Sequence, residues 1–274
     1  MELREQALRA LCCPQPEQKV RLVQAIYAQK AAIDLDTHAA LSALPDQLPG
    51  RPQRPTLIDP AQVPQRSPFT PLGHAALVHA ICHIEFNAIN LALDAVWRFA
   101  GMPAGYYQDW LQVAAEEAHH FGLLHRHLRQ LPKPNEPGNT WDYGDFDAHN
   151  GLWTMCEQTA HDITARMALV PRTLEARGLD ATPLIQAKLS KVKTPQAQEV
   201  VALLDIILRD EVGHVAIGNH WYRYLCEQQG LDPVAHYITL AERHRAPKLK
   251  PPFNQAARRK AGFSDQELDY LLGV

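Results

Sequence analysis

The sequence predicts an all-α protein, and three observations lead to this prediction. Apolar residues recur at helical i, i+3 and i+4 spacings over long stretches, for example between Val78 and Phe99. Proline and glycine mark the ends of most of these stretches. No stretch shows the alternation of apolar and polar residues that is typical of a sheet strand. The chain has 274 residues, 46% of them hydrophobic, which is enough for a helical core.

Two helices are expected near the N-terminus, over residues 3–11 and 16–35. Residues 45–71 then carry eight prolines, which exclude regular helix. This stretch also contains the apolar residues Leu57, Ile58, Val63 and Phe69. We therefore expect an ordered arm that lies across the surface of the domain, rather than a flexible linker.

Four long helices are expected over residues 74–100, 104–130, 151–177 and 195–230. Pro171 should kink the third helix and Gly178 should end it, and a short helix follows at 182–190. About twenty residues connect the second helix to the third. Four helices with one long crossover form the ferritin-like arrangement. The predicted fold is therefore a ferritin-like four-helix bundle with extra N-terminal and C-terminal helices.

The whole chain, residues 1–274, is predicted to form a single ferritin-like domain. Residues 1–72 would contain the N-terminal helices and the proline-rich arm, and residues 73–230 the bundle. Residues 231–274 would contain C-terminal helices and a basic segment. The last helix is expected to begin at Ser264, which can form a capping box with Glu267.

Charge and cysteine content indicate the compartment. The formal net charge of −3 argues against a protein that coats nucleic acid. The five cysteines are odd in number and lack CxxC spacing, so a reducing cytoplasm fits better than a disulfide framework. The N-terminus lacks the features of a signal peptide, and no apolar run is long enough to cross a membrane.

The segment 243–260 contains basic residues and no acidic residue. Its basic residues are Arg243, Arg245, Lys248, Lys250, Arg258, Arg259 and Lys260. This segment is either a solvated tail or a binding site for an anionic substrate, RNA included, with Phe253 as a stacking group.

One motif occurs twice, as EEAHHF at residues 116–121 and as DEVGHV at residues 210–215. Helical residues i and i+3 share a face, so Glu117 with His120, and Glu211 with His214, can each bind a metal ion. Apolar neighbours place both pairs on the core side of their helices, where a bare carboxylate is disfavoured unless it is paired or coordinated. The competing register joins Glu116 to His119, and the later residues His125 and His127 are expected at the surface.

A two-metal carboxylate site in a helix bundle needs one further glutamate from each of the other two helices. Glu85 lies in the middle of the apolar stripe of the first long helix, and Glu157 is the candidate in the third. His161 or Asp162 could replace or supplement Glu157. Four carboxylates and two imidazoles suit iron or manganese more than zinc. The expected cofactor is two iron ions, with manganese or a mixed pair as alternatives.

Several stretches resemble an uncharacterised ferritin-like di-iron family of bacterial and fungal proteins. They are HAALVHAICHIEFNAINLALDAVWRF, EEAHHFGLL, ARMALVPRTLEARGLD, LRDEVGHVAIGNHWYRYL and KPPFNQAARRKAGF. That family is distantly similar to the di-iron tRNA hydroxylase that acts on methylthio-isopentenyl-adenosine. The resemblance covers about residues 50–265 and implies a ferritin-like bundle with a di-metal site. The ferritin-like pattern falls on Glu85, Glu117, His120, Glu157, Glu211 and His214.

These features predict a cytoplasmic di-iron oxidoreductase. It would use dioxygen or peroxide and an external electron donor to hydroxylate or oxidise a small molecule or a modified nucleoside in RNA. One alternative is a ferritin-like protein that handles iron or detoxifies peroxide. The other is a non-enzymatic helical binding protein with a structural metal.

Overall fold

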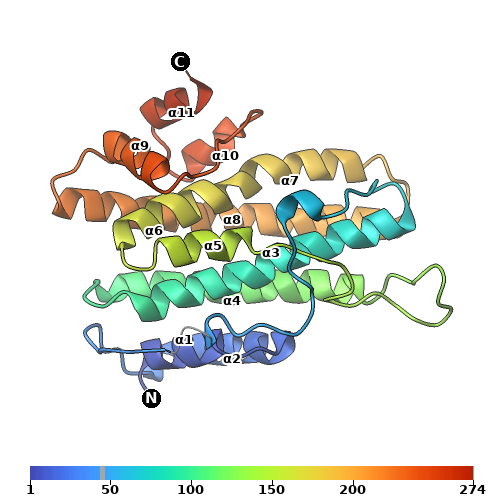
Figure 1. Ribbon diagram of the computed structural model, residues 1–274, viewed down its shortest axis with the longest axis horizontal. Helices are drawn as coiled ribbons and strands as arrows, with labels where there is room; N and C mark the ends of the chain where they lie inside the picture. Colours follow the sequence, from blue (N-terminus) through green and yellow to red (C-terminus); the bar gives the residue numbers. More distant parts are fainter. Residues whose placement is uncertain (44–46, 274) are drawn as a thin grey trace. The chain divides into compact units, whose positions relative to one another are not determined.

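The computed structural model describes residues 1–43 and 47–273, and these residues form helices but no strand. The protein is therefore all-α, as predicted. The long helices are α3 (Pro71–Arg98), α4 (Ala104–Leu128) and α8 (Pro195–Gln228), shown in Figure 1. The shorter helices are α1 (Leu3–Leu11), α2 (Pro16–Ala28), α5 (Gly151–Gln158), α6 (Ile163–Leu169), α7 (Ala176–Leu189), α9 (Pro233–Arg243), α10 (Gln255–Lys260) and α11 (Asp265–Leu272). Short 3₁₀ turns η1 (Lys30–Ala32) and η3 (Pro60–Gln62) and a π-helical segment η4 (Val170–Glu175) complete the described elements.

The described residues pack into two compact units. Unit 1 contains residues 1–153 and 189–203, and unit 2 contains residues 154–188 and the chain from residue 204 onward. The prediction of one ferritin-like domain, divided after residues 72 and 230, stays a prediction. Residues 45 and 46, where the predicted arm begins, lie outside the described residues, as does Val274.

The centre of unit 1 is a hairpin of α3 and α4, which pack against each other along their lengths (Figure 1). The side chain of Thr70 caps α3 by accepting a hydrogen bond from Gly73 N at 3.1 Å, and Pro71 occupies the first helical position. Gly101 turns the chain between the helices with a φ of 80°, which favours glycine. These local signals fix where α3 begins and where the hairpin reverses.

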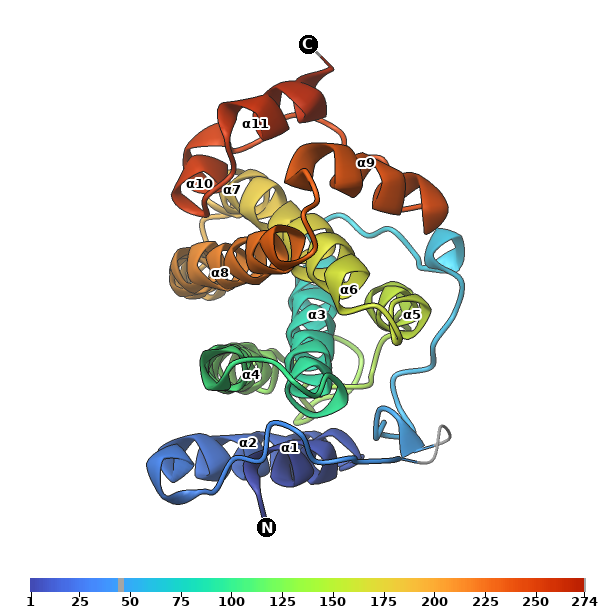
Figure 2. The same ribbon diagram turned by 90° about the vertical axis from the view of Figure 1, so that its left-hand side faces the viewer.

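Helices α1 and α2 form a second layer of unit 1, with α1 against α3 and α2 against α4 (Figure 2). Lys19 of α2 joins the layers through a fully buried ammonium group. Its Nζ donates to the carbonyl oxygens of Leu11 and Gly50, each at 3.0 Å, and to the side-chain oxygen of Asn90. One lysine therefore links α1, α2, the arm and α3.

The second predicted helix is shorter than expected. It ends at Ala28 instead of continuing to residue 35. The chain leaves the helix because its carbonyl groups have partners elsewhere: Asp34 O accepts from Leu3 N at 2.8 Å, and Asp36 O accepts from Arg4 Nη1 at 3.1 Å. These carbonyl oxygens therefore accept hydrogen bonds from residues of α1 instead of continuing the hydrogen bonding of α2.

The proline-rich arm is ordered over residues 47–71, as predicted. Gly50 N donates to Leu11 O at 2.8 Å, and a β-bridge joins Leu57 to Ala148, where Ile58 N donates to Ala148 O at 2.9 Å. The backbone of the arm is therefore hydrogen-bonded to other parts of unit 1 at two separate places.

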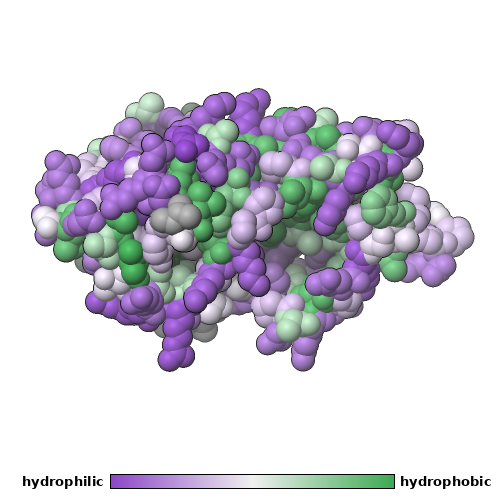
Figure 3. Space-filling model, turned by 90° about the horizontal axis from the view of Figure 1, so that it is seen from above, coloured by the Kyte–Doolittle hydropathy of each residue, from purple (hydrophilic) through white to green (hydrophobic). Residues whose placement is uncertain are grey.

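Helix α3 is long and apolar enough to cross a membrane, judged by length and composition. However, 78% of its most apolar window is buried inside the structure, as in the core helix of a soluble protein. The face shown in Figure 3 is covered largely by hydrophilic side chains, with separate apolar patches between them.

The third predicted helix, over residues 151–177, is interrupted. It breaks after Gln158, and Asp162 starts α6 by accepting a hydrogen bond from Ala165 N at 2.9 Å. The distortion expected at Pro171 is present as the π-helical segment η4. Gly178 does not end a helix but lies inside α7, which also includes the short helix predicted at 182–190. A glycine in a helix costs only about 1 kcal/mol, so it need not stop one.

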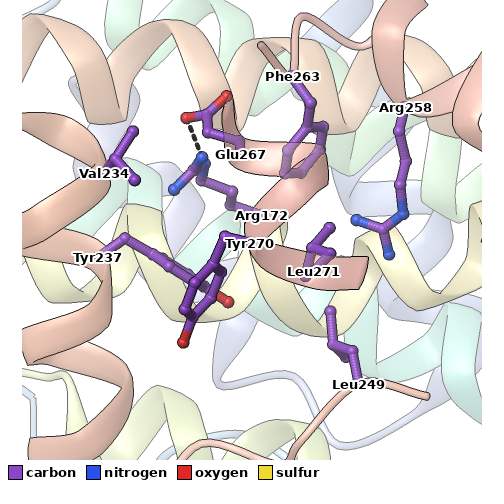
Figure 4. Close-up of a pocket in the computed structure, with 9 residues that line it drawn as sticks. All are labelled: Arg172, Val234, Tyr237, Leu249, Arg258, Phe263, Glu267, Tyr270 and Leu271. Carbon is purple, nitrogen blue, oxygen red and sulfur yellow. Dashed lines mark hydrogen bonds and ion pairs between the residues drawn. The ribbon is translucent and has the colours of Figure 1, made fainter. Parts of the chain in front are cut away.

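In unit 2, α9, α10 and α11 gather on α6, α7 and α8 (Figure 2). Arg172 of η4 lies at their centre. It donates to Asn219 Oδ1 at 2.8 Å and pairs with Glu267 of α11 (Figure 4), and its guanidinium stacks on Tyr222 and Tyr237. The C-terminal helices are thereby attached to the π-helical segment.

Within the predicted basic segment, Arg258 is not a surface residue. It is fully buried, pairs with Asp180 at 2.6 Å and lies over the ring of Phe253. Arg259 pairs with Asp265 at 3.1 Å. RNA binding by residues 243–260 stays a prediction. Arg258 and Phe253 pack against each other within unit 2.

Replacing Lys19 by methionine should lower the free energy of unfolding by about 3 kcal/mol, because Gly50 O and Asn90 Oδ1 lose their buried donor. Urea unfolding measures the change. Lys30→Met is the matched control, since Lys30 is exposed on the same part of the chain, and it should change stability by less than about 0.5 kcal/mol. Equal effects of the two substitutions would contradict this role for Lys19.

Candidate metal centre

Unit 1 contains a buried cluster of two glutamates and a histidine. Glu85 lies in the middle of α3, and Glu117 and His120 lie one turn apart on α4. Each side chain offers a ligand atom, and these atoms lie within 4.8 Å of one another. Nδ1 of His120 is 3.3 Å from Oε2 of Glu85 and 3.5 Å from Oε2 of Glu117. This buried cluster could bind a metal ion.

The hairpin geometry explains why these residues meet. Glu85 and Glu117 each lie sixteen residues from Gly101, in the connection between α3 and α4. Two antiparallel helices with the same rise per residue place such positions at the same level. Because both glutamates lie on the buried faces of their helices, their carboxylates converge.

A positive charge stabilises the two buried carboxylates of the cluster. Burial, and then the neighbouring Glu117 carboxylate, raise the pKa of Glu85. Burial alone would lower the pKa of His120, but hydrogen bonding and attraction to Glu117 and Glu85 raise it overall. Oε2 of Glu85 is buried, and Nδ1 of His120 approaches it to 3.3 Å. Two buried carboxylates beside one imidazole bind either a proton or a cation, and a divalent metal ion fits this donor set.

The structure distinguishes the two registers of the first motif. Glu117 and His120 are fully buried, whereas His119 is exposed and Glu116 is half-buried, where it accepts a hydrogen bond from Gln112 at 3.0 Å. The buried pair is therefore Glu117 with His120, the register that the apolar stripe predicted.

The second copy of the motif is also buried, in unit 2. On α8, Oε1 of Glu211 is 3.5 Å from Nδ1 of His214, and the two residues are 7% and 0% exposed. Oε2 of Glu211 is buried and, among the residues described, has no hydrogen-bond donor. Unit 2 therefore repeats the carboxylate–imidazole pair of unit 1.

The structure does not place the candidates of the third helix with these buried ligands. Glu157 and His161 are exposed, and Asp162 uses its carboxylate to cap α6. Their expected common face assumed a continuous helix, but the helix is broken between them. The break is held by Arg166, which donates to Thr159 Oγ1 at 2.8 Å.

A further acidic candidate, which the sequence did not indicate, is Glu175, the last residue of the π-helical segment η4. Helices η4 and α7 run antiparallel to α8. Pro171 packs closely on Gly218, and further along η4 and α7 Gln186 donates a hydrogen bond to the earlier residue Asp205 at 2.6 Å. Glu175 follows Pro171 by four residues, and His214 precedes Gly218 by four residues on the antiparallel helix α8.

By this count Glu175 is expected near the level of His214, and its side chain is half-buried. Glu157, in contrast, lies before the break, in α5. Glu85 and Glu117 lie at equal distances from the connection of their hairpin. The same spacing, applied to the α7–α8 hairpin, would have indicated Glu175. The prediction that a helix ends at Gly178 hides the second hairpin, because Gly178 lies inside α7.

The fold and the site define an all-helical protein with a buried glutamate–histidine cluster that could bind metal. The chain belongs to the family described as "Protein of unknown function (DUF455)", whose pattern matches residues 12–269. It is similar to a protein of Haemophilus influenzae described as uncharacterised, with 46% identity over 281 residues. That alignment covers 98% of this chain and 93% of the relative. No solved structure matches the chain.

Substitution of Gly218 should destabilise unit 2, because a Cβ there would lie 2.5 Å from Cβ of Pro171. We expect Gly218→Ala to cost about 1–3 kcal/mol. Gly213 of the same helix is the matched control: none of the described heavy atoms lies within 4 Å of its Cβ position. Gly213→Ala should stabilise the protein by about 0.5–1 kcal/mol. Thermal unfolding measures both, and stabilisation by Gly218→Ala would refute the close packing of η4 on α8.

Proposed function

We propose that this protein is a di-metal carboxylate oxidoreductase, with two iron ions as the favoured pair and manganese or a mixed pair as alternatives. It would activate dioxygen to hydroxylate or oxidise an organic substrate. The observation that carries the proposal is the buried Glu85–Glu117–His120 cluster of unit 1, together with the repeated Glu211–His214 pair of unit 2. One ferritin-like set of ligands, divided between two helical hairpins, accounts for both.

Each hairpin would supply one half of the ligand set. Glu85, Glu117 and His120 form the first half. Glu211 and His214 belong to the second, and we propose Glu175 as its third ligand in place of Glu157. Each half then consists of a lone glutamate on one helix and a Glu-x-x-His pair on the other, the pattern of ferritin-like carboxylate proteins.

The residues of unit 1 fit this chemistry by their burial and charge. His120 and Glu117 are fully buried, so they would hold an ion away from bulk water. The carboxyl of Glu85, whose pKa is raised, can keep a proton when no cation is near and release it when one binds. Iron held by carboxylates and imidazoles supplies dioxygen chemistry, and the protein supplies position and exclusion of water.

The first test is the metal content of protein from iron-supplemented cells, measured together with the optical spectrum. We expect about two iron ions per chain at this centre, by analogy with di-iron carboxylate bundles, and near-ultraviolet charge-transfer absorption. Glu117→Ala should lose these two ions and the absorption, because it removes a ligand that Glu85 and His120 cannot replace. Glu116→Ala, at the neighbouring half-buried position, should retain both. Failure to bind iron or manganese under any reconstitution would refute the proposal.

Iron storage is separated from substrate oxidation by the amount of iron oxidised. When excess ferrous iron is added in air, an oxygenase should oxidise only the ions that it binds. An iron-handling protein should instead turn over many ferrous ions per chain. Continued turnover would favour the ferritin-like alternative.

Comparison of Glu175→Gln with Glu157→Gln tests the third ligand of unit 2. Glu175→Gln should weaken metal binding by at least roughly 10-fold, since even outer partners of metal ligands contribute that much. Glu157→Gln should leave affinity unchanged because Glu157 is exposed. Isothermal titration of the metal-free chain with ferrous iron measures both affinities. A larger loss of affinity in Glu157→Gln than in Glu175→Gln would favour Glu157 as the ligand.

A further inference from the structure

A second cluster of possible metal ligands lies in unit 1, at the end of the α3–α4 hairpin away from its connecting turn. His74 is in the first turn of α3, His127 in the last turn of α4, and Glu199 near the start of α8. The imidazole rings of His74 and His127 are 6.0 Å apart between centroids, at an interplanar angle of 75°. Nδ1 of His127 is 3.2 Å from Oε2 of Glu199.

Both histidines are buried without hydrogen-bond partners. They are 7% and 1% exposed, so the surface position expected for His127 is wrong: the first turns of α8 supply Glu199 beside it. Among the described residues, no hydrogen bond reaches either ring nitrogen of His74 or His127, and Glu199 approaches His127 without the alignment of one. Buried polar atoms are normally satisfied, so these ring nitrogens point to a missing ligand, and a single metal ion would satisfy one nitrogen of each ring.

The donor set and the spacing fit a metal ion better than an anion. Neutral imidazoles and a carboxylate are the ligands that Zn²⁺ and Fe²⁺ accept. A metal–nitrogen bond of about 2.0–2.1 Å puts each ring centre roughly 3.2 Å from the ion, and the observed 6.0 Å lies within twice that distance.

This cluster is separate from the proposed di-metal centre. His127 lies seven residues beyond His120 on α4, and His74 eleven residues before Glu85 on α3. At a rise of 1.5 Å per residue these steps correspond to about 10 Å and about 16 Å along the helices. One ion could not serve both clusters.

We propose that His74, His127 and Glu199 form a mononuclear site for a divalent transition-metal ion of the Zn²⁺ or Fe²⁺ class. The ion would join the ends of α3 and α4 to the first turns of α8. Solvent can complete its coordination on the side of Glu199, whose side chain is 49% exposed. The site does not depend on the proposed oxidoreductase activity.

Titration of the full chain with Co²⁺ tests the site, because Co²⁺ reports its coordination by visible absorption and stands in for Zn²⁺. Chelator-stripped Glu117→Ala protein is used, so that the di-metal centre contributes little. We expect one Co²⁺ per chain, with visible bands that Zn²⁺ removes. Adding His127→Asn should weaken this binding at least roughly 100-fold. Adding His125→Asn, at a histidine already paired with Asp142, should not change it.

Glu199→Gln provides a second variant that leaves the core intact if His127→Asn prevents folding. It should also weaken Co²⁺ binding, and in the wild-type chain it should lower the total metal count by one. Absence of Co²⁺ binding in the Glu117→Ala chain would overturn the proposal. So would unchanged binding in both the His127→Asn and Glu199→Gln variants.

Discussion

Burial of two carboxylates in one helical hairpin is the constraint on which the rest of unit 1 depends. Taking Glu85 and Glu117 out of water costs several kcal/mol per charge unless a positive charge lies beside them. His120 supplies that charge as an imidazolium when it takes up a proton, and a divalent ion supplies more of it. A hairpin built only for stability would have apolar residues at these positions, so their burial indicates a binding role.

Other buried polar groups join the helices around this cluster. Lys19 joins α2 to the ends of α1, the arm and α3, and Arg4 donates to the carbonyl of Trp97 at 2.8 Å. The acceptors are backbone carbonyls and the side-chain oxygen of Asn90, not acids. These bonds attach the outer layer of helices, α1 and α2, to α3.

The sequence predicted most of unit 1 and less of unit 2, for physical reasons that particular residues show. Helical period and Gly101 place α3 and α4 because they act locally, although α3 begins at Pro71, three residues before the predicted start. The apolar stripe also selects Glu117 over Glu116. At the break after Gln158, Arg166 donates to Thr159 Oγ1 and to Cys156 O, and these contacts are not encoded in the helical period.

Glu157 was wrongly expected on a buried face for the same reason: the pattern around it assumes that the helix continues. Glycine is a frequent C-cap, so the sequence predicts a helix end at Gly178, yet tertiary contacts override this preference. Asn254 donates to Leu179 O at 3.2 Å, and Arg258 pairs with Asp180, so the C-terminal helices hold α7 together past the glycine. Such contacts join residues more than seventy positions apart, beyond the reach of local patterning.

The π-helical segment shows what the C-terminal helices contribute to the site. A π-helical turn holds more residues than an α-helical one, so it changes the direction in which later side chains point. It is less stable than an α-helix and persists where surrounding contacts fix it. Arg172 provides those contacts, since its buried guanidinium joins η4 to α8 through Asn219 and to α11 through Glu267. The position of Glu175, the ligand proposed for unit 2, therefore depends on α11, a helix that contains no proposed ligand.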